Sequence, residues 1–66
     1  MNPFKPGDLV WFRAAVRGAY GHAGRDVPAI FIGCTPQRAC IEVIMADGRR
    51  KQIAVAEKYL RRREAA

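Results

Sequence analysis

Positive charge is the feature of this chain most suited to chemistry. Lysines and arginines number 12 against 6 aspartates and glutamates, which gives a formal net charge of +6 over 66 residues. Seven of the basic residues fall in two short stretches late in the chain, 49–51 and 58–63. Such side chains neutralise phosphates and release counterions. They therefore predict a surface that binds nucleic acid with little regard to its sequence, and more weakly at high salt.

The two basic stretches would form one face if the strands that carry them lie side by side. Closure of a small barrel between the hairpin and the last strand would bring them together. The same residues could equally form a solvated surface that keeps edge strands soluble and apart. We expect phosphate contacts from Arg49, Arg50, Lys51, Arg61 and Arg62, with Arg17, Tyr20 and Arg25 contributing from an earlier loop.

Three aromatic side chains could add base stacking to this surface, because exposed rings beside arginines stack on unpaired bases. Trp11 alternates with Val10 and Phe12 along a strand, and we expect it to pack in the core. Tyr20 lies in a glycine-rich loop and is the better candidate for an exposed contact, whereas Tyr59 is expected to pack beneath one end of the fold. The three rings could alternatively form a cage for a methylated lysine or another cation.

Other reactive residues lack the partners that catalysis or metal binding would need. His22 has no carboxylate or nucleophile near it in sequence, which is typical of a histidine in a flexible loop. Cys34 and Cys40 lack the second pair of ligands of a zinc site, and we expect reduced, partly buried thiols, although a hairpin could permit a disulfide in an oxidising setting. Serine is absent, and no phosphate-cradling glycine motif occurs. We therefore expect no enzyme activity, no cofactor and no metal.

Length and composition favour a small domain that binds through its surface. A folded unit of this size buries only about 60% of the surface that its unfolded chain exposes, which leaves little stability for a deep catalytic cavity. The longest apolar stretch, 27–34, is much shorter than the roughly 20 residues of a membrane span. Because no apolar signal segment follows the first lysine, we expect a cytoplasmic protein. Residues 1–66 should form one domain, with 1–6 as an N-terminal arm and 63–66 as a disordered tail.

The first half of the chain predicts two strands on either side of a long loop. Residues 9–12 are rich in β-branched and aromatic side chains and predict the first strand. Between 14 and 26, three glycines stand among small and basic residues, which predicts a long, mobile loop. The apolar run 29–34 has the length of a second strand.

The second half predicts a hairpin and a closing strand. Residues 39–45 place apolar side chains on one face by alternation and predict the third strand. Asp47-Gly48 marks a turn, after which 50–55 returns as the fourth strand. Residues 56–59 are typical of a single helical turn, and the chain from Leu60 onward could form a brief last strand. This order predicts an all-β, five-stranded barrel of the SH3-like type.

The length of the turn between the third and fourth strands decides their register. A two-residue turn would place Ile53 opposite Glu42. A three-residue loop with a bulge at Gly48 places Ile53 opposite Ile41 and Gln52 opposite Glu42. The second register pairs apolar with apolar and polar with polar, and is the one we expect.

The stretch Gly7-Asp8-Leu9-Val10-Trp11 resembles the start of a PWWP domain, one of several SH3-like families. Val27-Pro28-Ala29 is similar to the Trp-Pro-Ala step of that family, with Val27 in the place of tryptophan. The resemblance covers barely half of the chain. It implies a barrel of the kind that reads a modified peptide or the DNA backbone, and only the fold is carried over here.

The order of segments is also similar to that of the plasmid-borne type II dihydrofolate reductases, which are short SH3-like barrels. The matching segments are Pro6–Val10, Gly33–Thr35, Gln52–Val55 and Leu60-Arg61. That family lines the pore of a tetramer with a Gln-Ile-Tyr stretch, and this chain has Gln52 and Ile53 followed by Ala54. The resemblance implies the same architecture and a tendency to self-associate, whereas Ala54 in the tyrosine position argues against reductase activity.

These patterns together predict a small, non-enzymatic module that binds nucleic-acid phosphates through a basic face. One alternative is a protein-interaction module or homo-oligomer that uses an apolar edge including Trp11 and Phe31. A more remote alternative is a reductase-like tetramer.

Overall fold

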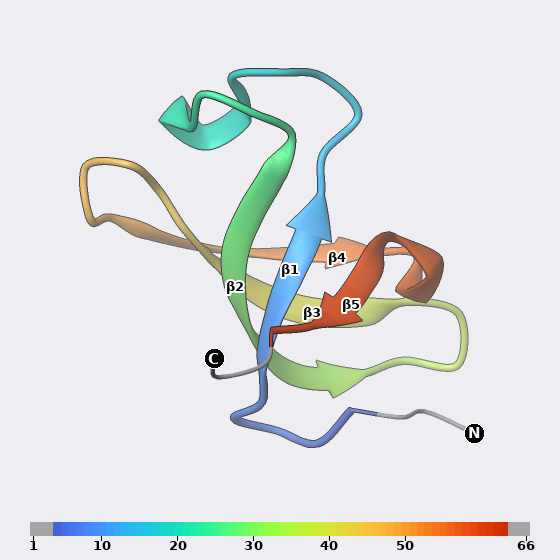
Figure 1. Ribbon diagram of the computed structural model, residues 1–66. Helices are drawn as coiled ribbons and strands as arrows, with labels where there is room; N and C mark the ends of the chain where they lie inside the picture. The colour runs from blue at the N-terminus through green and yellow to red at the C-terminus, as the bar shows by residue number, and fades with distance from the viewer. Residues whose placement is uncertain (1–3, 64–66) are drawn as a thin grey trace.

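The computed structural model describes residues 4–63, which form an all-β fold (Figure 1). Five strands follow one another as β1 (Leu9–Arg13), β2 (Asp26–Cys34), β3 (Ala39–Ile44), β4 (Arg50–Val55) and β5 (Leu60–Arg62). Two short 3₁₀ turns, η1 (Ala19–Gly21) and η2 (Glu57–Tyr59), precede β2 and β5. The predicted five strands and the helical turn before the last one are confirmed. No helix within the described residues is long and apolar enough to cross a membrane.

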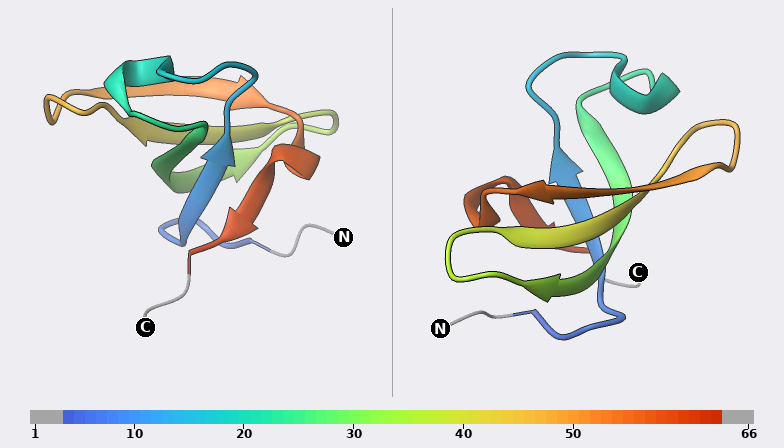
Figure 2. Two further views of the ribbon diagram at one scale, coloured as in Figure 1. Left: turned by 45° about the horizontal axis from the view of Figure 1, so that its top comes forward. Right: turned by 180° about the vertical axis from the view of Figure 1, so that it is seen from behind.

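The strands form one antiparallel sheet in the order β4-β3-β2-β1-β5, so that β4 and β5 are its two outer strands. β2 is nine residues long and pairs with β1 near its start and with β3 near its end. The pairing between β2 and β3 shifts between Phe31 and Gly33, and such an irregularity bends a strand. Figures 1 and 2 show β3 and β4 crossing behind β1 and β2. The sheet therefore curls around a single core.

Alternation along the strands decides which side chains form the core. Val10 and Phe12 point inward from β1 and are 0% and 9% exposed. Trp11 lies between them, points to the outer face and is only half-buried, so the expectation that it packs in the core was wrong. A strand can bury either the one ring or its two neighbours, and the two neighbours together remove more apolar area from water. The core comprises Val10, Phe12, Ala14, Val27, Ala29, Phe31, Ala39, Ile41, Val43, Val55 and Leu60.

The hairpin between β3 and β4 has the register expected from a three-residue loop. Ile41 lies opposite Ile53, and Glu42 lies opposite Gln52. The N–H of Met45 donates to the carbonyl oxygen of Arg49 (2.7 Å), which closes the loop over 46–48. Gly48 has a φ of 89°, a conformation that a residue without Cβ adopts at no steric cost. The prediction from side-chain pairing is thus confirmed.

The segment between β1 and β2 is anchored at both its ends and its middle, which corrects the expectation of a mobile loop. The N–H of Ala14 donates to the carbonyl oxygen of Arg25 (2.7 Å), and Nε of Arg25 donates back to the carbonyl oxygen of Ala14 (2.9 Å). Farther along, the N–H of Ala46 donates to the carbonyl oxygen of Tyr20 (3.0 Å). Tyr20 is half-buried against the core rather than exposed as expected. Gly21 approaches Ala46 so closely that a Cβ on it would lie 3.0 Å from the Cβ of Ala46.

His22 also anchors this segment, and it does so because of a proline in β2. That strand begins at Asp26, earlier than predicted, and includes Pro28. Ala29 pairs with Val43, so Pro28 comes next to Ile44 in the antiparallel register, where it has no N–H to offer. Nε2 of His22 lies 2.7 Å from the carbonyl oxygen of Ile44. Since a carbonyl only accepts, Nε2 carries the proton and donates the missing hydrogen bond.

Where the structure describes them, the expected arm and tail contact the sheet. The ring of Phe4 packs on Phe31, with 5.6 Å between ring centroids, and the N–H of Gly7 donates to the carbonyl oxygen of Phe31 (2.8 Å). The N–H of Arg63 donates to the carbonyl oxygen of Leu9 (3.0 Å). The other residues of the expected arm and tail, 1–3 and 64–66, lie outside the described residues.

Replacing His22 should lower stability because the carbonyl of Ile44 would lose its donor. For His22→Ala we expect the free energy of unfolding to fall by about 1 to 2 kcal/mol, the usual result of leaving a half-buried polar group unpaired. Gln37→Ala, at an exposed position in the turn between β2 and β3, is the control and should change stability by less than about 0.5 kcal/mol. Urea unfolding measures the free energy of unfolding of both variants. If His22→Ala is as stable as Gln37→Ala, the anchoring role of His22 is contradicted.

Candidate functional site

Most of the arginines predicted to contact phosphates already face a carboxylate. Four of the five late-chain residues expected to contact phosphates form ion pairs. These are Arg49–Asp47 (3.3 Å), Arg50–Glu42 (3.2 Å), Arg61–Asp26 (2.9 Å) and Arg62–Asp8 (3.4 Å). The fifth, Lys51, is exposed on β4 opposite Val43. All four arginine side chains remain more than half exposed, so each pair adds little to stability. The pairs nevertheless offset part of the positive charge locally.

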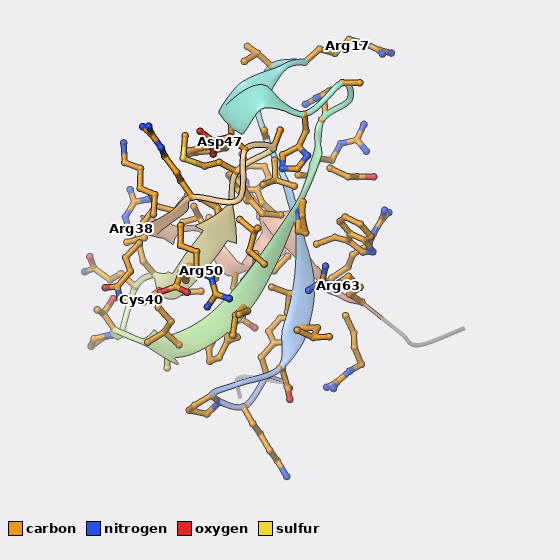
Figure 3. The ribbon with its side chains drawn as sticks, turned by 90° about the vertical axis from the view of Figure 1, so that its left-hand side faces the viewer. Arg17, Arg38, Cys40, Asp47, Arg50 and Arg63 are labelled. Carbon is orange, nitrogen blue, oxygen red and sulfur yellow. The ribbon has the colours of Figure 1, made fainter. Side chains whose placement is uncertain are left out.

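The two basic stretches do not form the single face that barrel closure would have required. β4 and β5 are opposite outer strands of the sheet. Arg50 begins β4 beside the hairpin loop, whereas Arg61 lies opposite Trp11 of β1. Figure 3 shows Arg17 at one end of the molecule, well away from Arg50 and Arg63. The predicted site residues are therefore dispersed over several surfaces.

A different set of basic residues comes together in a groove of about 550 Å³. Segments distant in sequence form it, namely the end of β1, the residue before β2, the turn before β3, the end of β4, and η2. It is lined by Arg13, Arg25, Arg38 and Lys58, one from each of four segments. Figures 1 and 2 show η2 and the turn between β2 and β3 on the same side of the molecule, away from the hairpin loop at 46–48.

The charges in this groove, unlike those of the hairpin, are not offset. Within residues 4–63, none of Arg13, Arg25, Arg38 and Lys58 forms an ion pair with a carboxylate, and no aspartate or glutamate lines the groove. Nε of Arg25 is held by the carbonyl oxygen of Ala14, which fixes the direction of that side chain. Like charges gathered in a hollow with low-dielectric walls focus a positive potential there. The groove is accordingly suited to an anion.

Small side chains make the groove hollow, and apolar ones form part of its lining. Ala15, Ala54 and Ala56 line it and have side chains of a single methyl group, while Phe12 and Val55 of the core also line it. Tyr59 also lines the groove and is 46% exposed, so the expectation that its ring packs beneath the end of the fold was wrong. Leu60, the residue directly after η2, is the one that enters the core at this end.

Of the residues expected from the sequence to contact phosphates, Arg25 alone lines the groove. Arg13 and Arg38 were missed because each stands apart from other basic residues in the sequence. Lys58 belongs to a recognised basic stretch but was not among the expected contacts. No local signal marks these residues as neighbours, because only the curl of the sheet brings them together.

Two further expectations concern cysteines and an apolar edge. Cys34 is exposed and Cys40 half-buried, both are free, and they are not register partners, since Cys40 pairs with Gly33. Phe31 is 1% exposed, so it cannot form the apolar surface expected together with Trp11. Leu9 and Ile32 instead expose apolar area, at 49% and 38%.

No family model, curated protein or solved structure matches this chain.

Charge removal should affect stability with opposite sign inside and outside the groove. Arg38→Gln relieves repulsion among cations, and we expect the free energy of unfolding to stay unchanged or rise by a few tenths of a kcal/mol, about the size of exposed charge effects. Arg61→Gln removes a pair with Asp26 and should lower it by up to about 1 kcal/mol. Urea unfolding at low ionic strength compares two variants of equal net charge. A greater loss in Arg38→Gln would show that its charge is offset in the folded state.

Proposed function

We propose that this protein is a small, non-enzymatic module that binds nucleic acid through its phosphates, and that the basic groove is the contact site. The observation that carries the proposal is the gathering of Arg13, Arg25, Arg38 and Lys58 in one groove that no carboxylate lines within the described residues. Arginine and lysine are the side chains that proteins use to neutralise phosphates. The interaction between these cations and phosphates is electrostatic, so the affinity for nucleic acid should fall strongly as salt is added.

The shape of the groove favours a chain of phosphates over one small anion. Four segments each contribute one cation around an open hollow of about 550 Å³, so the charge is distributed around the groove rather than held at one point. Nucleic acid presents phosphates in a row and can contact several of these cations at once. The ion-paired arginines, Arg49, Arg50, Arg61 and Arg62, contribute to the long-range field of a chain with net charge +6 and so speed encounter with a polyanion.

Membership of the SH3-like superfamily is part of the same proposal. The order of strand, long loop, three strands joined by turns, 3₁₀ turn and last strand supports it. A cytoplasmic location is proposed as well, because an exposed thiol such as that of Cys34 stays reduced in that compartment.

Removing two groove charges should weaken binding more than removing two charges elsewhere. We expect the double variant Arg13→Gln/Arg38→Gln to bind an oligonucleotide at least tenfold more weakly and to lower the salt slope by about 1.4 to 1.8, since each phosphate contact contributes roughly 0.7 to 0.9. The control is Arg49→Gln/Arg50→Gln, which removes the same charge from the β3–β4 hairpin, where both arginines already face carboxylates.

Fluorescence anisotropy of a labelled oligonucleotide at several salt concentrations measures affinity and slope together. The control should lose less than about threefold in affinity, as expected for charges that act only through the general field. If both variants weaken binding equally, the groove is not the contact site. If the parent protein binds no oligonucleotide even at low salt, the proposed function is wrong.

A further inference from the structure

The groove contains more than phosphate binding requires. Beside its cations it holds the exposed ring of Tyr59 and apolar lining from Phe12 and Val55. A site for phosphates alone gains nothing from the aromatic ring of Tyr59, a residue that is 46% exposed to water. A ring beside cations suits a ligand that carries planar, stackable groups between its negative charges.

A second, smaller hollow adjoins the groove at Tyr59. This hollow of about 90 Å³ shares Arg13, Lys58 and Tyr59 with the groove, and Trp11 and Arg61 line it as well. Tyr59 is thus shared by two adjoining hollows, and the half-buried side chain of Trp11 lines the smaller one. The two hollows and their rings form a continuous track, which we call the aromatic track.

Each ring of the aromatic track already has a cation over it. Nζ of Lys58 lies 5.3 Å from the ring centroid of Tyr59, and Cζ of Arg63 lies 5.3 Å from the centroid of the Trp11 ring. Both rings of the track are therefore next to positive charge, which favours a ligand that combines bases with phosphates.

One carboxylate reaches the track, and it is already neutralised. Asp26 lines the smaller hollow and accepts a hydrogen bond from Arg61 at 2.9 Å. The groove itself has none within the described residues. A polyanion that follows the track would meet no unpaired negative charge there.

We infer that the aromatic track takes a single, unpaired nucleic-acid strand, with one base stacked on Tyr59 and another on Trp11 while phosphates contact Arg13, Arg25, Arg38 and Lys58. A duplex presents its phosphates on a convex surface and keeps its base faces inside the stack, so it can use the cations but not the rings. The inference rests on the proposed function and adds the class of ligand. The shared chemistry is that of base and phosphate, in DNA or RNA.

The experiment compares one sequence as single-stranded DNA, single-stranded RNA and duplex DNA, each titrated into the full chain at one salt concentration. Tyr59→Leu removes the ring and keeps an apolar side chain, and Tyr59→Phe is the matched control that keeps the ring. For single strands we expect Tyr59→Leu to weaken binding roughly 5- to 100-fold, the range for one base stacked on an aromatic ring. Tyr59→Phe should retain parent affinity, and neither change should alter binding of the duplex.

The fluorescence of Trp11 supplies a second readout, because it is the one tryptophan of the chain. Single strands should quench it and the duplex should not. A preference between DNA and RNA would identify the sugar that fits, and equal affinity would indicate recognition through base and phosphate alone; both results support the inference.

Other outcomes would overturn the inference, and they separate it from the proposed function. Equal affinity for duplex and single strands, unchanged in Tyr59→Leu, would refute the stacking and leave phosphate binding in place. Polyglutamate that binds as tightly as a single strand, with the same loss in Tyr59→Leu, would show that the track takes an acidic polypeptide instead. Absence of binding to every oligonucleotide would refute the proposed function itself. Thermal unfolding of both Tyr59 variants checks that each is folded.

Discussion

A single antiparallel sheet of five short strands can bury its apolar side chains only by curling over itself, and this constraint decides where each charged residue lies. β2 is long enough to pair with both β1 and β3, and its irregularity after Phe31 lets the sheet turn. The turn brings the end of β1, the residue before β2, the turn before β3 and η2 around one groove. The groove is a consequence of burying the core, and its cations are those that these segments carry.

The basic residues divide into two groups with different roles. On the hairpin and on β5, arginines face carboxylates at 2.9 to 3.4 Å, which offsets part of their charge. In the groove, cations from four segments lie together without carboxylates in the described part of the chain. Such an arrangement costs some stability through repulsion, and a bound polyanion would offset that cost. Net charge alone does not distinguish the two groups, whereas the position of each carboxylate does.

Local patterns in the sequence predicted the strands and even the register of Ile41 with Ile53, because alternation and turn length act over a few residues. They failed for Trp11, because its two neighbours in the strand competed with it for the core. They also failed for His22, whose hydrogen bond depends on Pro28 in β2. The groove could not be foreseen either. Arg13 and Arg38 stand alone in sequence and become neighbours only through the curl of the sheet. Clustering along the chain instead pointed to arginines that the fold pairs with carboxylates.

The most direct test of this account is a titration of the backbone amide NMR spectrum with a short single-stranded oligonucleotide, at low and at raised salt. The account predicts shifts at Arg13, Arg25, Arg38 and 56–59 that weaken as salt is added, with the hairpin loop at 46–48 nearly unchanged. Shifts centred on that loop would contradict the assignment of the groove as the binding site. An unperturbed spectrum at low salt would contradict nucleic-acid binding as the function.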